Sequence, residues 1–150
     1  MNKRSLNKNY ALLAVVIPGL AACTQQAPQT LVTIADARLS SAQRIDIGIP
    51  GDSVGDILTF DQPLLDEGMT EIGNNSGMCI RTRVEHSFQC QWTLTFESGS
   101  IEVAGRELDS GTSTISIVGG TGVYSGIYGE MESTNNDDGT FTQILRYQIR

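Results

Sequence analysis

Apolar and polar residues alternate along several short stretches of this chain. The clearest case is 88–97, where Phe88, Cys90, Trp92, Leu94 and Phe96 fall on one side of an extended chain and polar residues fall on the other. A period of two predicts β-strands with one buried face. No stretch beyond residue 22 has apolar residues at helical spacing over three turns. The strands expected are 31–39, 55–65, 69–73, 77–85, 88–97, 101–104, 112–118, 127–133 and 140–149, with a short extra segment at 45–49.

Glycine, asparagine, aspartate and serine separate these strands, as expected for turns. A sheet of eight or nine short strands has to close or stack to hide its edges. The pattern therefore predicts an all-β domain, either a small antiparallel barrel or a sandwich. An eight-stranded barrel has an interior that holds side chains or one small ligand, so the interior is where a site is expected.

The first 23 residues have the features of an export signal. Basic residues are followed by an apolar run at 11–22 and then by Cys23, and this order is typical of a secretory signal peptide. The run is shorter than the roughly 20 residues of a membrane span. The sequence Leu-Ala-Ala-Cys at 20–23 resembles the bacterial lipobox, in which the cysteine carries fatty acyl chains such as palmitate. An ordinary secretory signal is the alternative.

These features predict three segments: a lipoprotein signal peptide at 1–22, a polar tether at 23–30, and a single β-barrel domain at 31–150. Lipid on Cys23 would hold the protein to a membrane of the bacterial cell envelope. Thr24, rather than aspartate, follows the cysteine, which favours the outer membrane if the envelope is Gram-negative.

Charge and composition restrict the partners. The chain has a formal net charge of -7 at pH 7 and contains one histidine. An acidic domain without a basic stripe repels polyphosphate, so nucleic-acid binding is not expected. One histidine and no spaced acidic motif argue against a metal site, and we expect no cofactor.

Cysteine usage agrees with export. If Cys23 carries lipid, Cys79 and Cys90 remain as a pair in an oxidising compartment. A disulfide between neighbouring strands is one interpretation, and two free buried thiols are the other.

A glycine-rich stretch at 115–130 predicts a strand, a turn and a second strand. It resembles a dinucleotide-binding turn, but the residues after it are strand-like and leave no room for a βαβ unit. We therefore interpret it as a barrel hairpin. Its glycines are Gly119, Gly120, Gly122, Gly126 and Gly129.

The same stretch carries a family resemblance. Residues 118–130 read Val-Gly-Gly-Thr-Gly-Val-Tyr-Ser-Gly-Ile-Tyr-Gly-Glu, which resembles the signature shared by plant dirigent proteins and allene oxide cyclases. Three further blocks follow the family's order: Gly55-Asp56 with Phe60, Gly73 with Gly77-Met78-Cys79, and 99–105. The resemblance implies a closed, calycin-like barrel of about eight antiparallel strands with a central apolar pocket, often assembled as a homotrimer.

Carried over residue by residue, the resemblance gives a partial site. Cys79 falls on the cyclases' pocket cysteine, and Gln62 falls near an asparagine that holds a water molecule. Thr33 and Ala35 stand where the family has a glutamate and an asparagine, so allene oxide cyclisation is not expected. Trp92 and Phe96 are further candidates for the pocket lining, and no catalytic residue is assigned.

Two functions follow from these observations. The first is an envelope lipoprotein whose barrel binds a small apolar or aromatic molecule and, if it is an enzyme, steers cyclisation or coupling as a cofactor-free isomerase or cyclase. The alternative is a non-enzymatic structural or protein-interaction module of the envelope. The missing glutamate, and the loss of Cys79 to a disulfide, would favour the second.

Overall fold

The computed structural model describes residues 27–38 and 42–150 of the 150-residue chain. The expected signal peptide at 1–22, the lipidation site Cys23 and the first residues of the tether lie outside the described residues. Within the described residues, no helix is long and apolar enough to span a membrane.

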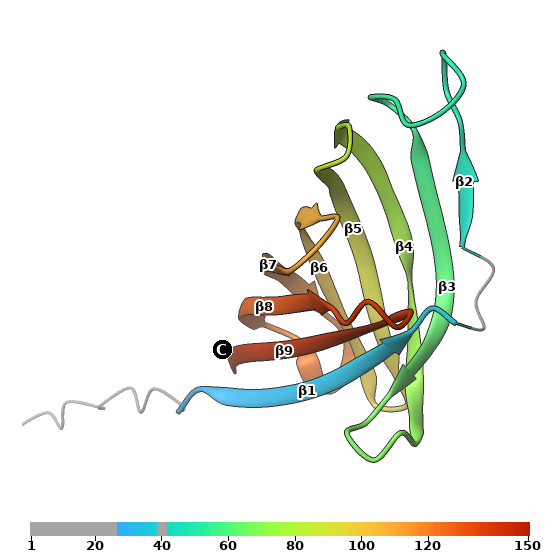
Figure 1. The fold of residues 1–150 in the computed structure, drawn as a ribbon. Coiled ribbons are helices and arrows are strands. Elements are labelled where there is room, and N and C mark those ends of the chain that lie inside the picture. The colour runs from blue at the N-terminus through green and yellow to red at the C-terminus, as the bar shows by residue number, and fades with distance from the viewer. Residues whose placement is uncertain (1–26, 39–41) are drawn as a thin grey trace, which may run out of the picture.

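Nine strands and one 3₁₀ turn make up the described fold (Figure 1). They are β1 (Gln29–Asp36), β2 (Gln43–Ile45), β3 (Ile57–Leu65), β4 (Glu71–Arg83), β5 (Ser87–Phe96), β6 (Gly99–Leu108), β7 (Thr112–Gly120), η1 (Gly122–Tyr124), β8 (Ile127–Asn135) and β9 (Thr140–Ile149).

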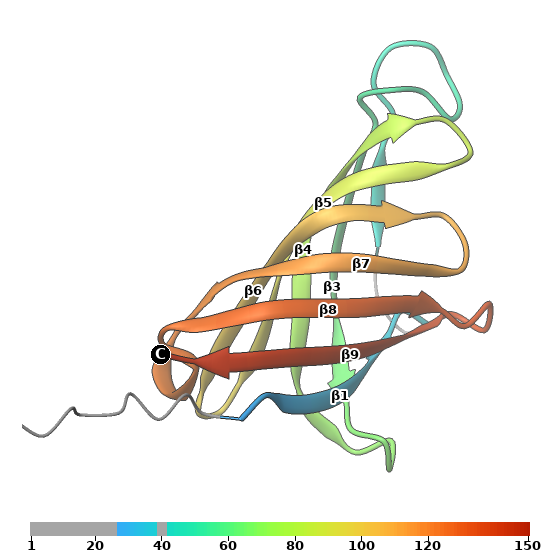
Figure 2. The ribbon, with the colours of Figure 1, turned by 90° about the vertical axis from the view of Figure 1, so that its left-hand side faces the viewer.

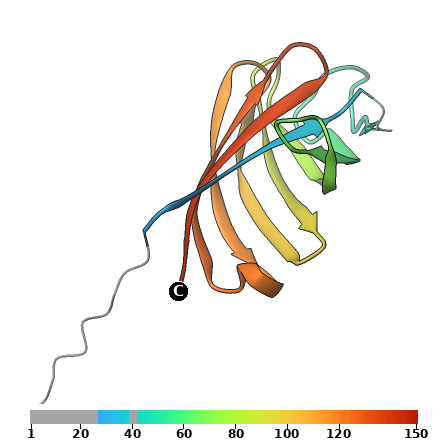
Figure 3. The ribbon, with the colours of Figure 1, turned by 90° about the horizontal axis from the view of Figure 1, so that it is seen from below.

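All neighbouring strands pair antiparallel, in the order β1-β9-β8-β7-β6-β5-β4-β3-β2. A further pairing of β1 with β3, in which Ile34 is opposite Leu65 and Ala35 is opposite Leu64, closes eight strands into a barrel. β2 is a ninth strand, which pairs with residues 57–59 at the start of β3. Figures 2 and 3 show how the sheet curves round until β1 lies beside both β9 and β3. The all-β barrel expected from the sequence is confirmed.

Several strand limits were predicted wrongly. The extra strand β2 ends at Ile45, although it was expected at 45–49, and β6 extends to Leu108, although it was expected at 101–104. The sequence Asn74-Asn75-Ser76 was interpreted as a turn between two strands, but these residues lie inside the single long strand β4. They pair with β3 on one side and with β5 on the other. Pairing on both sides satisfies the backbone, and this outweighs the turn preference of asparagine. As a result, the Asn75 side chain points into the barrel and is buried.

One end of the barrel is filled by apolar side chains. Inward positions of β5 to β9 supply fully buried residues, namely Leu94, Ile101, Val103, Ile115, Met131 and Leu145. Beyond them, the ring of Tyr124 packs on Phe96 with ring centroids 5.5 Å apart, and on Tyr147 at 6.4 Å. This end is therefore closed by core packing, and space for a ligand has to lie toward the other end.

The glycine-rich stretch forms the β7–η1–β8 connection, as the hairpin interpretation expected. Gly119 and Gly120 end β7, and Gly129 lies in β8. Gly122 has φ of +60°, and a Cβ atom there would lie 2.2 Å from the carbonyl oxygen of Ser98. Only glycine fits a backbone that turns this way so close to another strand.

Candidate functional site

The open half of the barrel contains a cavity of about 210 Å³. Its walls are mostly apolar and come from β3, β4, β5, β6, β8 and β9, together with Ala37 and Ala42 between β1 and β2. The apolar lining consists of Ala37, Ala42, Leu58, Phe60, Trp92 and Phe141. Polar groups also line it, from Gln62, Asn75, Glu107, Ser133 and Gln143. A mainly apolar cavity with a few polar groups is the usual form of a small-molecule site.

A second hollow, of about 430 Å³, lies outside the barrel over β7, β8 and β9. Thr114, Ser116, Glu130 and Arg146 are among the residues that line it. Although it is larger, it is a shallow depression on the outer face of the sheet. The interior cavity is therefore the better candidate for a site.

A close approach between β4 and β5 positions Trp92 in the wall of the cavity. Gly77 lies opposite Trp92 in the strand register, and a Cβ atom on Gly77 would lie 2.3 Å from the Cβ of Trp92. The missing side chain leaves space in which the indole lies against Phe60, in an edge-on contact with centroids 6.3 Å apart. The pair forms a rigid aromatic surface inside the barrel.

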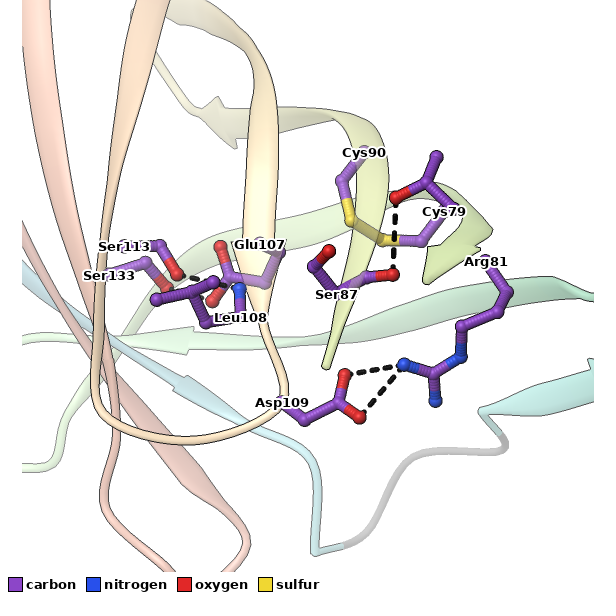
Figure 4. Close-up of a disulfide and its surroundings, with 10 residues drawn as sticks. Cys79, Arg81, Ser87, Cys90, Glu107, Leu108, Asp109, Ser113 and Ser133 are labelled. Carbon is purple, nitrogen blue, oxygen red and sulfur yellow. Dashed lines mark hydrogen bonds and ion pairs between the residues drawn. A yellow bond between two sulfur atoms is a disulfide. The ribbon is translucent and has the colours of Figure 1, made fainter. Parts of the chain in front are cut away.

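Cys79 and Cys90 form the cross-strand disulfide that the sequence suggested. They are register partners on β4 and β5, with an S–S distance of 2.01 Å and Cα atoms 4.0 Å apart (Figure 4). Both residues are buried, and Cys79 lines the cavity. The alternative of two free thiols is therefore wrong. Because the sulfur of Cys79 is bonded to that of Cys90, Cys79 does not present a thiolate to a ligand.

Glu107, near the end of β6, places a carboxyl group at the cavity. The hydroxyl of Ser133 donates a hydrogen bond of 2.9 Å to its Oε1, whereas its Oε2 is buried without a partner. Burial raises the pKa of Glu107 from 4.5 to about 7, and hydrogen bonds from Ser133 and Ser113 oppose this only in part. Of the described residues that line the cavity, Glu107 is the only one that titrates, since Cys79 is disulfide-bonded. Figure 4 shows it between the two serines and the disulfide.

A network of charged groups lies at the same end of the barrel. The guanidinium of Arg81 donates to both carboxylate oxygens of Asp109, at 2.6 and 2.8 Å (Figure 4). It also donates to Asp52 at 2.8 Å. It also lies 3.6 Å from the centroid of the Phe88 ring. Asp52 accepts the backbone N–H of Glu85 as well, and this bond contributes most to lowering the pKa of Asp52. The network holds the loop before β3 against the ends of β4 and β6.

Arg81 and Arg83 lie two residues apart on β4, so regular alternation would place both side chains on one face of the strand. A register shift between them separates their environments. Arg81 is buried at the barrel end and Arg83 is exposed. The alternation could not show this bulge, because a bulge changes the face without a change in residue type.

The structure brings together three of the five pocket candidates from the sequence: Gln62, Cys79 and Trp92 line the cavity. Thr33 is buried behind the lining, where its hydroxyl donates a 3.0 Å hydrogen bond to Oε1 of Gln143. Phe96 lies at the closed end against Tyr124.

Sequence reasoning did not select Asn75, Glu107, Ser133 or Gln143, which line the cavity too. No group of three or more side chains able to hold a metal ion is found within 27–38 and 42–150.

Comparison with known families and structures supports the barrel. The family described as "Allene oxide cyclase barrel like domain" matches residues 35–144. No curated protein matches the chain.

Solved structures with the same fold include three with different activities in their names. One is a pyocyanin demethylase, with a TM-score of 0.71, 24% identity, and coverage of 80% of this chain and 100% of that one. Another is the pterocarpan synthase dirigent protein GePTS1, with a TM-score of 0.67, 13% identity, and coverage of 92% and 98%. A third is the Diels Alderase AbmU from Streptomyces koyangensis, with a TM-score of 0.65, 18% identity, and coverage of 82% and 64%. At these identities the likeness concerns the fold.

Proposed function

The chain belongs to the allene oxide cyclase barrel-like family, and we propose that it binds a small apolar or aromatic molecule inside the barrel and steers its cyclisation or coupling. The observation that carries this proposal is a protonatable carboxyl group, Glu107, at a cavity with mainly apolar walls. The structural relatives include a protein named as a dirigent protein and one named as a Diels Alderase, which makes steering of this kind chemically reasonable for the fold.

Positioning is the main contribution expected from such a cavity. A flexible intermediate confined between Phe60, Trp92 and Phe141 can adopt only a few conformations, and those that place its reacting ends together react faster. Confinement of this kind needs few acid or base groups. It therefore fits a cavity in which one lining residue titrates.

Glu107 supplies the acid–base step. With a pKa of about 7, it is present in both protonation states near neutral pH. The neutral carboxylic acid can give its proton to an oxygen or nitrogen of the bound intermediate, and the carboxylate can take one back after the ring or bond has formed. Proton donation and return balance over a cycle that isomerises the bound intermediate, so ring closure requires no oxidant or reductant, and coupling would take place only between intermediates that arrive already oxidised.

The first experiment is a binding screen. Purified protein is mixed with a panel of aromatic and terpenoid compounds, and bound compounds are identified by native mass spectrometry. Ala37→Trp should abolish binding by filling the cavity from its edge, whereas Ser116→Trp, in the outer hollow, should leave binding unchanged. The proposal fails if no compound binds or if only Ser116→Trp blocks binding. In that case the alternative of a non-enzymatic envelope module is favoured.

We also propose that the protein is exported and anchored to the envelope through lipid on Cys23. The sequence at 20–23 supports this, and a Cys79–Cys90 disulfide is of the kind that persists in oxidising compartments. Cells labelled with a fatty-acid analogue should incorporate it into the protein, and Cys23→Ala should lose the label at equal protein level. If the variant is still labelled, Cys23 is not the site of lipid attachment and the proposed anchor is wrong. The homotrimer implied by the resemblance stays a prediction.

A further inference from the structure

Three residues that line the cavity each have a buried polar atom without a hydrogen-bond partner in the described part of the chain. The atoms are Nε1 of Trp92, Oδ1 of Asn75 and Oε2 of Glu107. Buried polar groups in folded proteins are nearly always paired, and a group left unpaired is costly. Among described residues, the one other atom of this kind is Nδ1 of His86, in the β4–β5 turn. The concentration of unpaired atoms at one cavity indicates that their partner is a bound molecule.

Each of the three atoms requires a particular kind of hydrogen-bond partner on the ligand. The indole N–H of Trp92 can only donate, so it needs an acceptor on the ligand. The amide oxygen of Asn75 can only accept, so it needs an N–H or O–H group. Because Oε1 of Glu107 already accepts a hydrogen bond from Ser133, Oε2 can donate a hydrogen bond when the carboxyl is protonated and accept one when it is ionised, so it suits a polar atom of either kind.

The strand arrangement places these groups on three consecutive strands. Asn75 is on β4, Trp92 on β5 and Glu107 on β6, and all three residues line the same cavity. The aromatic rings of Phe60 and Phe141 supply flat surfaces around it. A flat ligand that packs on these rings turns its polar atoms, which lie in the plane of its own ring system, toward the polar groups of the lining.

The size of the cavity restricts the ligand further. Its volume of about 210 Å³ is below the roughly 300–1,000 Å³ of sites for drug-sized molecules. A compound of about two fused rings therefore fits. A carboxylate on the ligand would be disfavoured, because the one titrating group of the lining is itself an acid.

We propose that the cavity selects a flat heteroaromatic compound of about two fused rings that accepts a hydrogen bond from the Trp92 indole and donates one to the Asn75 amide oxygen, with Glu107 contacting a further polar edge. This inference rests on the proposed function, because it specifies the chemical class of the molecule bound at that site.

Four probes of nearly equal shape separate the polar contributions: naphthalene, 2-naphthol, quinoline and 6-hydroxyquinoline. Naphthalene is the unsubstituted two-ring frame. 2-Naphthol carries a hydroxyl group, quinoline carries a ring nitrogen, and 6-hydroxyquinoline carries both. Isothermal titration calorimetry measures the affinity of each probe for the parent protein and for every variant, because the probes absorb and emit light in the same range as an indole ring. We expect 6-hydroxyquinoline to bind at least about tenfold more tightly than naphthalene.

Variants assign each contact. Trp92→Phe keeps an aromatic ring but removes the N–H, so it should weaken quinoline binding by about five- to tenfold and leave naphthalene binding unchanged. Asn75→Leu should weaken 2-naphthol binding to a similar extent, whereas Asn75→Asp keeps an acceptor and should retain it. Ser116→Ala, in the outer hollow, is the control and should change none of the four affinities.

The outcomes separate this inference from the function on which it rests. If all four probes bind equally and the Trp92 and Asn75 variants bind like the parent, the unpaired atoms serve only water, and the inference is wrong although the cavity still takes apolar ligands. If none of the four binds, the ligand class is wrong, and the proposed function fails with it only if the screen of aromatic and terpenoid compounds also finds no bound compound. Circular dichroism of each variant verifies that a lost affinity does not reflect a lost fold.

Discussion

Replacing Glu107 by glutamine should make the protein more stable at neutral and alkaline pH but not at acid pH. The carboxyl has Oε2 buried without a partner, and its pKa is raised from 4.5 to about 7 mainly by burial. Glutamine keeps an Oε1 that can accept the hydrogen bond from Ser133. The substitution therefore removes the ionisation of residue 107 with little change in shape.

The sign and size follow from the two pKa values. Below pH 4.5 the carboxyl is protonated in both the folded and the unfolded chain, so its ionisation does not affect stability. Between pH 4.5 and about 7 the unfolded chain ionises while the folded one keeps its proton, and the free energy of unfolding falls by about 1.4 kcal/mol per pH unit. Above about pH 7 both forms are ionised and the loss stays constant, at about 3 kcal/mol.

Urea unfolding of the parent protein and of Glu107→Gln at half-unit steps from pH 4 to pH 8.5 measures this difference. The variant should gain about 3 kcal/mol relative to the parent across this range, with most of the gain between pH 5 and pH 7. Glu102→Gln removes a carboxyl from an exposed position on the same strand and serves as the control. A difference between Glu107→Gln and the parent that is the same at every pH would refute the buried, protonatable carboxyl and with it the acid–base role.

Two further predictions concern the wall of the cavity. Replacing both Cys79 and Cys90 by alanine should lower the free energy of unfolding by about 3 kcal/mol, because the disulfide closes a loop between residues 11 positions apart and so restricts the unfolded chain. In the double variant, a reducing agent should have no further effect on urea unfolding. Gly77→Ala should cost at least about 2 kcal/mol, because its Cβ would lie within 2.4 Å of two atoms of β5. Gly119→Ala, with nothing within 4 Å of its Cβ, should change stability by about 0.5 kcal/mol or less, and equal effects of the two glycine replacements would contradict the close approach.

The barrel was predictable because its signal is carried by many residues. Apolar residues alternate along strands such as β5 and β9, and the turns between strands, apart from the loop at 46–56, are short and rich in glycine and polar residues. The sequence could not give the depth of a residue within the barrel. Trp92 and Phe96 share the inward face of β5, yet one lines the cavity and the other packs at the closed end, because depth depends on the register and tilt of all eight strands.

The cavity itself was harder to predict, because polar residues at inward positions look like the ends of strands. Asn75 was placed in a turn for this reason, although pairing on both sides keeps it in β4. Gln143 lies buried on the inward face of β9, where apolar residues flank it at every second position. A polar residue is therefore assigned safely to the interior only where the alternation continues beyond it.

Glu107 shows how this test applies to the acid of the cavity. β6 was expected to end at residue 104, but the inward positions Ile101 and Val103 continue in steps of two through Gly105 to Glu107. Counted round the closed barrel, β6 lies four strands from β1 in either direction, so Glu107 comes from the wall opposite Thr33. The absence of a first-strand glutamate therefore does not leave the cavity without an acid. An acid on the opposite wall reaches the other side of a bound molecule, which is why we expect a reaction different from allene oxide cyclisation in the same barrel.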